Sequence, residues 1–558
     1  MIIGLDMGGT HVDAVIIENG EIINSSKNPI DKNNLFQSIW IALKDILPND
    51  RSKIKQINLS TTISTNAIVE KKTSPVAMFI QSGPGLPHHF LACGDENTFL
   101  SGYIDHRGQT IKDLDVNEIK NSINTLKHKN ITACGVVTKF STRNPNHEME
   151  IKEQVQTEFT HITMGHTLSG KLNFPRRVNT TYLNAAVYDT FQIFSQSIKQ
   201  AMKQEGLENI PLYVLKADGG TMNIAGAENM PVETILSGPA ASLMGINAML
   251  ETKKDAILMD IGGTTTDIFF LANGVPLFEP LGIQIDQHKT LVRSVYSQSI
   301  GIGGDSYIEG KNGKLTIGPQ RVGPPMAFGG THPTPTDAMV VLGHLDQGNR
   351  NNAYEGMQTL GRSFNLSAEE IAEEVLRLMA KTIKDKVTEL LKTINSQPVY
   401  TIKELLDDQQ IEPQLIHMIG GPAKVLAPIL EEEFELPCHY PQKYDVANAV
   451  GAALSRTTAK ISLVADTFHQ TLSVPELGIY KKISRDYTLD NARKEALELL
   501  VEHGKRIGAT KDNIETEIIE ESSFNMVRGF STDGHNIRIE AQIKPGLIDK
   551  IGGIDTHA

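Results

Sequence analysis

Cysteine is scarce in this chain of 558 residues, which contains only Cys93, Cys134 and Cys438. Three widely separated cysteines form no CxxC pair and no disulfide framework, so a secreted disulfide scaffold is excluded and a reducing compartment is favoured. No stretch approaches the ~20 apolar residues that a membrane helix needs. The N-terminus enters a strand pattern at once, with no basic region or cleavage site before it. These absences predict a cytoplasmic protein without a membrane partner.

Positive charge is also in deficit, because 53 Lys and Arg face 66 Asp and Glu, which gives a formal net charge of -13. Such a balance repels a polyphosphate backbone, so we expect no nucleic-acid partner. A local basic pocket for one nucleotide remains compatible with it. The length exceeds what one hydrophobic core supports, and two to four domains are expected.

Glycine, in contrast, is abundant, and two glycine-rich segments repeat one another. Residues 3–20 read IGLDMGGTHVDAVIIENG, and residues 257–274 read ILMDIGGTTTDIFFLANG. Each copy predicts an apolar strand, a tight turn, a second apolar strand and an Asn-Gly hairpin turn. A separation of about 250 residues is too long for a solenoid repeat and indicates a duplicated domain. The matched pairs are Asp6 and Asp260, Gly8 and Gly262, Gly9 and Gly263, Thr10 and Thr264, and Asp13 and Asp267.

The repeated Asp-x-Gly-Gly-Thr turn has the composition of a phosphate-binding loop. Adjacent glycines let backbone N–H groups approach an anion without an intervening Cβ, and threonine adds a hydroxyl donor. A carboxylate at the end of the first strand, Asp6 or Asp260, can hold a hydrated Mg²⁺. An ordinary glycine-containing hairpin would explain one copy, but it does not require the same residues twice. Neither strand is followed by GxxxxGK[ST] or by a GxGxxG that opens a helix, which disfavours P-loop and Rossmann proteins.

A duplicated strand–turn–strand phosphate loop resembles the actin, sugar-kinase and Hsp70 superfamily. The resemblance implies an α/β fold with duplicated, ribonuclease H-like lobes around an ATP cleft. We expect lobes at residues 1–175 and 176–460, and a small α+β C-terminal domain at residues 461–558, where no glycine-rich loop follows the predicted strands.

Other patterns predict individual helices. Residues 35–47 read as an amphipathic helix, and residues 182–205 as a helix that ends before Gly206. Ser367 and Glu370 form a capping box that opens a long helix to about residue 391. In the C-terminal region, strands are expected at residues 462–466, 471–474, 514–520 and 536–543, and a helix at residues 490–504.

The order of several motifs over roughly residues 1–460 resembles the ATP-dependent hydantoinase A/5-oxoprolinase family, which includes subunits of acetone-type carboxylases. The chain departs from the family pattern at Ala217, where serine is usual, at Asp305, which interrupts a run of three glycines, and at an eroded stretch over residues 323–328. The long C-terminal region of oxoprolinases is replaced by about 100 residues. After the first phosphate loop the motifs are STTISTNAIVEKK (60–72), NPNHE (144–148), RVNTTYLNA (177–185), ADGGTM (217–222), LSGPA (236–240), DIGGTTTD (260–267), GIGGDS (301–306), TDA (336–338), LGHLD (342–346) and IGGPA (419–423).

This resemblance implies an ATP-dependent hydrolase that opens a five-membered cyclic amide, a hydantoin or 5-oxoproline, through a phosphorylated carbonyl. ATP and Mg²⁺ would be the cofactors, and a second, hydantoinase B-like subunit is a candidate partner. The implied nucleotide-binding residues are Gly8, Gly9, Thr10, Gly262, Gly263, Thr264, Thr265, Gly303 and Gly304, with Gly420 and Gly421 against the adenosine.

Three carboxylates are the candidate catalytic residues. Asp6 and Asp260 would also hold the metal, and Asp218 would act as a base or position a water, although an Asp that stabilises its own turn explains it nearly as well. Asp337 and His344 are candidates for the substrate side, where the alternative is a structural role.

Three alternatives remain open at this stage. A carboxylase-type subunit would phosphorylate a ketone, an enol or bicarbonate in the same cleft. An ATP-switched regulatory or assembly protein would use the cleft to drive lobe closure. A sugar kinase fits the lobes but leaves the NPxHE and TDA motifs without a role.

Overall fold

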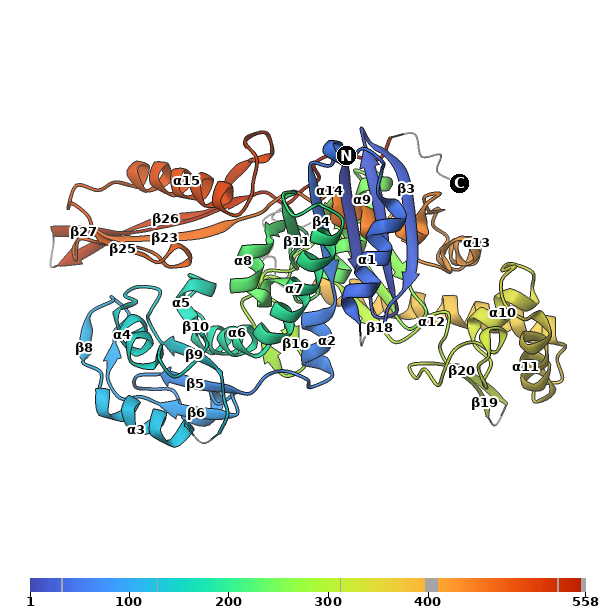
Figure 1. Ribbon diagram of the computed structural model, residues 1–558, viewed down its shortest axis with the longest axis horizontal. Coiled ribbons are helices and arrows are strands. Elements are labelled where there is room, and N and C mark those ends of the chain that lie inside the picture. Colours follow the sequence, from blue (N-terminus) through green and yellow to red (C-terminus); the bar gives the residue numbers. More distant parts are fainter. Residues whose placement is uncertain (32–33, 128, 312, 397–409, 529–530, 553–558) are drawn as a thin grey trace.

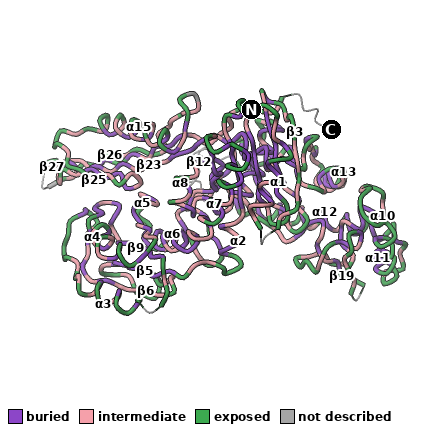
Figure 2. Tube along the Cα trace, viewed as in Figure 1, coloured by how far each residue is buried: buried purple, intermediate pink, exposed green. Residues whose placement is uncertain are grey.

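The protein, described here by a computed structural model for residues 1–31, 34–127, 129–311, 313–396, 410–528 and 531–552, has two β-sheets at its centre with helices between and around them (Figure 1). In these ranges no helix combines the length and the apolar character that a membrane crossing requires. Buried residues concentrate in the central sheets and on the helices that cover them (Figure 2).

The first central sheet is mixed, with the strand order β12-β11-β4-β1-β2-β3. Strands β1 to β3 form an antiparallel meander, in which Asn19 and Gly20 supply the positive φ angles of the β2–β3 turn. Strands β1, β4 and β11 are parallel, so their carboxyl ends meet at one edge of the sheet. The bounds are β1 Ile2–Met7, β2 His11–Glu18, β3 Glu21–Pro29, β4 Gln56–Thr61, β11 Leu212–Leu215 and β12 Thr221–Asn223.

The second central sheet repeats this design around the second glycine-rich turn. Its order is β15-β14-β13-β21-β22, and β18 pairs with β14. Asn273 and Gly274 again supply the positive φ angles of the turn after β14, and β21 runs parallel to β13. The bounds are β13 Ala256–Ile261, β14 Thr266–Ala272, β15 Val275–Pro276, β18 Gln298–Ile300, β21 Leu415–Ile419 and β22 Cys438–His439. The predicted duplication of an α/β lobe is confirmed.

Two helices, α9 (Ser237–Met249) and α14 (Ala447–Leu454), lie between the sheets and share one core with Val15 of β2 and Leu258 of β13. They pack backbone against backbone, because a Cβ on Gly245 of α9 would overlap the carbonyl of Ala447 on α14. The two lobes are therefore joined through small residues at a close helix crossing.

Other helices cover the outer faces of the two sheets. Helices α1 (Leu35–Ile46) and α7 (Tyr188–Gln204) cover the first sheet, and α12 (Ala368–Ser396) and α13 (Ala423–Phe434) cover the second. The expected helix at residues 35–47 and the capping box of α12 are confirmed. Glu370 N–H donates to Ser367 Oγ at 3.2 Å, and Ser367 N–H donates to Glu370 Oε2 at 2.8 Å.

A smaller parallel sheet of order β10-β9-β5-β6 is inserted into the first lobe. The helix expected at residues 182–205 is instead divided between two helices, α6 and α7, which meet at Val187. At this junction the Ala186 carbonyl accepts the N–H of Ser74 rather than an N–H of the next helical turn. The bounds are α2 Ile63–Val69, β5 Val76–Gln81, β6 Glu96–Phe99, β7 Tyr103–Ile104, β8 Thr110–Lys112, α3 Val116–Leu126, β9 Ala133–Thr138, α4 Asn146–Val155, β10 His161–Met164, α5 Gly165–Leu168, α6 Phe174–Ala186 and α8 Ile224–Asn229.

A further group of elements packs around α12 beside the second sheet: β19 Ile308–Lys311, β20 Lys314–Ile317, α10 Pro335–Val341 and α11 Arg350–Arg362. The hairpin of β16 Gln284–Ile285 and β17 His288–Lys289 packs instead against α6, where Asn179 Nδ2 donates to the Lys289 carbonyl at 3.1 Å.

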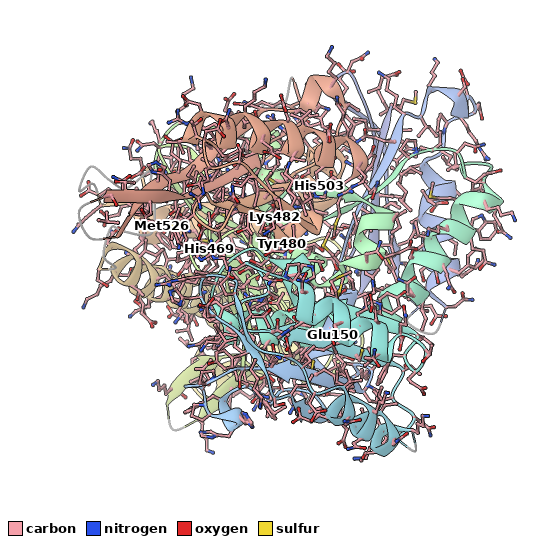
Figure 3. All side chains as sticks on the ribbon, turned by 90° about the vertical axis from the view of Figure 1, so that its left-hand side faces the viewer. Glu150, His469, Tyr480, Lys482, His503 and Met526 are labelled. Atoms are coloured by element: carbon pink, nitrogen blue, oxygen red, sulfur yellow. The ribbon has the colours of Figure 1, made fainter. Side chains whose placement is uncertain are left out.

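The C-terminal domain is an antiparallel sheet of order β25-β24-β23-β27-β26, covered on one face by helix α15. The predicted α+β composition is confirmed, and β25 is an additional strand. This domain lies beside the inserted sheet, as Figure 3 shows with His503 on the domain and Glu150 on the insertion. The bounds are β23 Lys460–Asp466, β24 Thr471–Val474, β25 Ile479–Lys482, α15 Leu489–Arg506, β26 Thr516–Arg528 and β27 Ser531–Ile543.

The expected division at residues 175 and 460 remains a prediction about domains. Its first boundary falls inside α6, and the first sheet takes β11 and β12 from beyond it. Its second boundary falls at the start of β23.

Candidate functional site

The two glycine-rich turns have the same backbone geometry. The N–H of Gly8 donates to the carbonyl of His11 at 3.0 Å, and the N–H of Gly262 donates to the carbonyl of Thr265 at 2.9 Å. Residues 9–10 and 263–264, at the tips of the turns, are exposed. Both turns therefore present backbone to an incoming ligand, as a phosphate loop requires.

Asp6, at the end of β1, is buried and accepts a hydrogen bond from the hydroxyl of Ser60 on β4. Burial, together with the smaller effects of the negative charges of Asp13 and Asp260, raises the pKa of this carboxyl to about 7 against the opposing hydrogen bond from Ser60. Asp260 belongs to the other sheet, so the structure brings the two predicted metal-binding carboxylates within electrostatic reach of each other.

Asp260 is held by both helices of the interlobe layer. Ser242 Oγ on α9 donates to Asp260 Oδ2 at 2.7 Å, and Asn448 Nδ2 on α14 donates to the same oxygen at 3.2 Å. Burial, followed by the charge of Asp260, raises the pKa of the cross-strand neighbour Asp267 to about 7. A second cluster of carboxyl groups thus lies at the second turn.

The Asp6–Asp260 pair fits a hydrated divalent cation. The charge of Asp260 raises the pKa of Asp6, and a cation between two such carboxylates would remove the repulsion between them. Among the described residues, no group of three or more His, Cys, Asp or Glu could hold a metal ion. Water would therefore have to complete the coordination shell, which is usual for Mg²⁺.

The Gly420–Gly421 turn lies directly against Asp260. Gly420 adopts φ +94°, and a Cβ there would lie 2.7 Å from Asp260 Oδ1. A Cβ on Gly421 would meet nothing within 4 Å, so this second glycine has open space beside it. The predicted adenosine motif and the second phosphate loop are brought together.

Gly303 and Gly304 also lie at the second loop, but their backbone faces the protein. The N–H of Gly304 donates to the carbonyl of Gly262 at 3.0 Å, and the N–H of Asp305 donates to the carbonyl of Gly263 at 2.6 Å. This segment supports the turn from behind. Direct contact of Gly303 and Gly304 with a nucleotide remains a prediction.

Asp218 lies apart from the Asp6–Asp260 pair. It accepts from Gly220 N–H at 2.9 Å and from Thr458 Oγ1 at 3.0 Å, and Lys216 Nζ lies 3.3 Å from its Oδ2. Burial by itself raises the pKa of Asp218, but Lys216 and Arg293 outweigh it and hold the pKa below its ordinary value. The contact with Gly220 matches the turn-stabilising interpretation, while the candidate role as a base stays a prediction.

Asp337 is engaged in structure. It is fully buried and accepts the N–H groups of Met326 at 3.0 Å, Ala327 at 2.7 Å and Thr334 at 2.9 Å, the last as the capping box of α10. Both carboxylate oxygens accept hydrogen bonds from neighbouring residues of the protein, which leaves little for a substrate. His344 is exposed.

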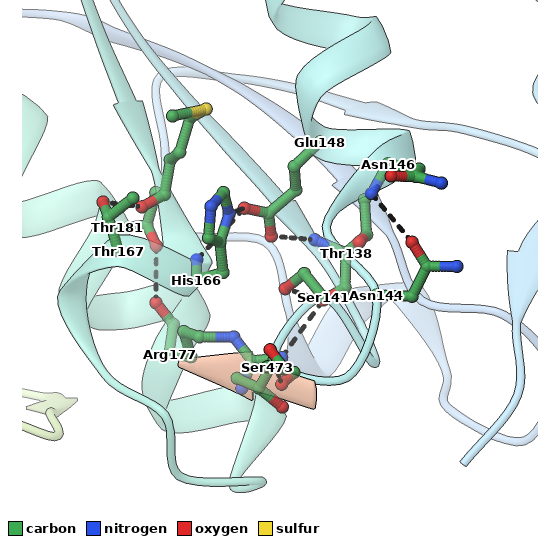
Figure 4. Close-up of polar contacts among 12 residues, drawn as sticks. Thr138, Ser141, Asn144, Asn146, Glu148, His166, Thr167, Arg177, Thr181 and Ser473 are labelled. Atoms are coloured by element: carbon green, nitrogen blue, oxygen red, sulfur yellow. Dashed lines mark hydrogen bonds and ion pairs between the residues drawn. The ribbon is translucent and has the colours of Figure 1, made fainter. Parts of the chain in front are cut away.

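The NPxHE motif forms a buried structural network (Figure 4). Glu148 accepts from Thr138 N–H at 2.8 Å and from His166 Nδ1 at 2.6 Å. Arg177, also fully buried, donates to the carbonyls of Lys171 and Lys139, each at 2.7 Å. These buried charges hold β9, α4 and α6 together.

Sequence reasoning did not single out Ser60, Ser242 or Asn448, which hold the two central carboxylates. Ser60 lies within the motif at residues 60–72, and Ser242 follows the LSGPA motif. Ser60 reaches Asp6 through the parallel β1–β4 register, whereas Ser242 and Asn448 reach Asp260 because α9 and α14 pack between the sheets.

Comparison with known proteins identifies the family. Residues 177–461 match the hydantoinase/oxoprolinase family, and residues 2–159 match the hydantoinase/oxoprolinase N-terminal region. The acetophenone carboxylase gamma subunit of Aromatoleum aromaticum is 23% identical over 75% of this chain and 61% of its own length. The caprolactamase subunit alpha of Pseudomonas jessenii is 22% identical over 75% of this chain and 64% of its own length. The chain thus matches less than two thirds of either relative.

The fold agrees with a solved structure of acetone carboxylase without nucleotide. The superposition has a TM-score of 0.72 at 14% sequence identity, and it covers 99% of this chain and 88% of the acetone carboxylase chain. The α/β fold expected from the sequence is confirmed. On its sequence and its fold, the chain belongs to the hydantoinase/oxoprolinase family.

Proposed function

We propose that this enzyme uses ATP to open a five-membered cyclic amide, of the hydantoin or 5-oxoproline type, through a phosphorylated carbonyl intermediate. One observation carries the proposal: Asp6 and Asp260, at matched positions of two glycine turns on different sheets, lie within electrostatic reach of each other. A pair of carboxylates flanked by two such turns suits a magnesium nucleotide, and neither hairpin alone supplies it.

In this proposal each loop has a separate task. Residues 8–10 and 262–265 direct backbone N–H groups and threonine hydroxyls toward the phosphates. Asp6 and Asp260 hold Mg²⁺ through water, and Gly421, which has open space beside it, faces the adenosine.

The chemistry explains why the cleft is needed. An unstrained lactam carbonyl is a poor electrophile, and its nitrogen is a poor leaving group. ATP supplies a phosphoryl group to the carbonyl oxygen, which activates the ring for attack by water. The protein then contributes mainly positioning and neutralisation of charge, and one backbone donor aimed at developing charge is worth ~3–4 kcal/mol.

A second reaction class is favoured by the similarity to the acetophenone carboxylase gamma subunit. A carboxylase-type subunit would use the same cleft to phosphorylate a ketone or bicarbonate. Both relatives are named as subunits, so we also propose that this chain works with a second, hydantoinase B-like chain.

The assay that separates the two classes is ADP release, with the chain purified together with any partner that copurifies from its native host. Stimulation by hydantoins or 5-oxoproline, and not by ketones with bicarbonate, supports ring opening. The reverse pattern selects the carboxylase class. ADP release that no small molecule stimulates contradicts both.

A further inference from the structure

A cavity of about 890 Å³ lies outside the cleft, where three parts of the molecule meet. Its walls come from residues 167–172 after β10, from the β11–β12 turn with Asp218, and from strands β23, β26 and β27 of the C-terminal domain. We call this the interdomain cavity. Neither Asp6 nor Asp260 lines it. Its volume is within the ~300–1,000 Å³ typical of small-molecule sites.

Cations from three segments converge on this cavity: Lys171 from the insertion, Arg293 from the second lobe and Lys460 from β23. Burial, then the charges of Lys171 and Arg293, lowers the pKa of Lys460 to about 7. Burial, then Arg293, also lowers the pKa of Lys171. The three positive groups are therefore close enough to repel one another inside the protein.

Arg293 is held in place at the cavity wall. Its guanidinium lies 4.3 Å from the ring centroid of Phe278, and its Nη1 donates to Gln542 Oε1. Its charge acts on Lys171 and Lys460 and also on Asp218 across the cavity. A planar guanidinium fixed by stacking suits recognition of a carboxylate.

Several acidic residues of the wall are committed to other partners, while Glu520 lies close enough to attract both Lys171 and Lys460. Glu476 accepts from Gly170 N–H at 2.8 Å and from Ser462 Oγ at 2.9 Å. Glu540 forms an ion pair with Lys460, and Asp218 forms one with Lys216. No hydrogen bond or ion pair to the Lys171 ammonium occurs within the described part of the chain.

A second pair of cations, Arg143 and Arg538, lies on the same wall. Burial and then Arg538 lower the pKa of Arg143 to about 10. The Nε and Nη1 atoms of Arg143 are buried without a hydrogen-bond partner in the ranges that the structure describes. Buried donors in this condition cost free energy unless a ligand or water satisfies them.

We propose that the interdomain cavity binds a small organic molecule bearing a carboxylate, held between Lys171, Arg293 and Lys460. Apolar wall residues, among them Met222, Met230 and Phe278, suit a carbon skeleton. The remaining acidic side chains of the wall repel a doubly charged phosphate more than a single carboxylate. This site is distinct from the ATP cleft, although Asp218 follows β11 and Asp6 ends β1, two strands apart, or ~10 Å, along one sheet edge.

Calorimetric titration of the full chain, without nucleotide, tests this directly. The probes are the monocarboxylates butyrate and phenylacetate, with butyramide and phenylacetamide as uncharged counterparts. At least one acid is expected to bind at least tenfold more tightly than its amide. The double variant Lys171→Met/Lys460→Met is expected to weaken that acid at least tenfold, whereas Lys481→Met, on β25 outside the cavity, keeps the wild-type affinity within twofold. Binding of no acid, or equal binding of acid and amide, overturns the proposal.

Chemical labelling of the wild-type chain tests the same proposal without depending on the folding of a variant. At pH 7.5 an amine-acetylating reagent should modify Lys460 readily, because its pKa is about 7. A bound acid is expected to slow modification of Lys171 and Lys460 at least fivefold and to leave Lys481 unchanged. Equal rates with and without every acid overturn the proposal. A Mg-ATP thermal shift on the same sample shows independently whether the cleft is functional.

Discussion

Ser242 on α9 donates a hydrogen bond of 2.7 Å to Asp260, so the helix between the two sheets fixes the carboxylate that faces Asp6. Asn448 on α14 donates to the same oxygen at 3.2 Å. The helices that join the lobes thereby also orient the candidate metal site, which couples the placement of the lobes to its geometry.

Replacing either central carboxylate should abolish turnover without unfolding the chain. Asp6→Asn and Asp260→Asn each remove a negative charge from the candidate Mg²⁺ site while preserving side-chain shape. We expect Mg-ATP turnover, measured as ADP release, to fall more than about 100-fold. Asp50→Asn, an exposed Asp that caps a short helix through Ser52, is the matched control and should retain full activity. Full activity in either central variant would mean that the cleft is wrongly assigned.

Removing the hydrogen-bond donors Ser242 and Asn448 should weaken Mg²⁺ binding more than it disturbs the placement of the nucleotide. Ser242→Ala and Asn448→Ala keep the Asp260 side chain but leave it less well oriented. Loss of such a supporting hydrogen bond typically costs ~10–100-fold in metal affinity. We expect the Mg²⁺ concentration for half-maximal activity to rise at least about tenfold, with a smaller change in kcat at saturating metal. Ser197→Ala on α7, where the hydroxyl bonds only Ile193 within its own helix, should behave as wild type. An unchanged Mg²⁺ dependence would contradict the positioning role.

The two adjacent glycines of the predicted adenosine turn should differ sharply in their tolerance of alanine. Gly420→Ala places a Cβ at φ +94° and 2.7 Å from Asp260 Oδ1, which should destabilise the fold by ~1–3 kcal/mol. Gly421→Ala meets nothing within 4 Å and should change the free energy of unfolding by less than ~0.5 kcal/mol. Urea denaturation of both variants measures the difference. Equal stabilities would show that the turn is not pressed against Asp260.

Asp6 should make the metal-free protein less stable as the pH rises. Burial raises its pKa from 3.8 to about 7, so between these values the folded state keeps a proton that the unfolded state has lost. Stability must therefore fall as pH increases through this window, and the full penalty applies above pH 7. With EDTA present, Asp6→Asn should be more stable than wild type at pH 8, by on the order of 2–4 kcal/mol, and similar to it near pH 4. A less stable variant at pH 8 would show that Asp6 stabilises the fold as an anion.

The sequence predicted those parts of the fold that depend on local pattern. The two hairpins follow from strand–turn–strand segments that end in Asn19-Gly20 and Asn273-Gly274, and the start of α12 follows from the Ser367 capping box. The entry of β11 and β12 into the first sheet depends on long-range pairing that no local signal marks.

The candidate site also contains residues that the sequence pattern predicted and residues whose roles depend on long-range packing. Asp260 and Gly420 come together because their motifs end the neighbouring parallel strands β13 and β21, and the repeat made visible the matching turn that carries Asp6 on the first sheet. Asp218 shares a similar glycine-rich turn, yet it faces a different cavity because β11 lies two strands from β1. The structural role of Asp337 could have been predicted, since Thr334-x-x-Asp337 has the spacing of a capping box.

The central claim is that the two glycine turns bind one magnesium nucleotide between them, and a thermal-shift titration with Mg-ATP tests it most directly. A ligand that binds only the folded state stabilises it by RT ln(1 + [L]/Kd), so millimolar Mg-ATP should raise the Tm of the wild-type chain progressively. The double variant Asp6→Asn/Asp260→Asn should lose this rise with Mg-ATP. No change in wild-type Tm at millimolar Mg-ATP, or the same rise in the double variant, would contradict the account.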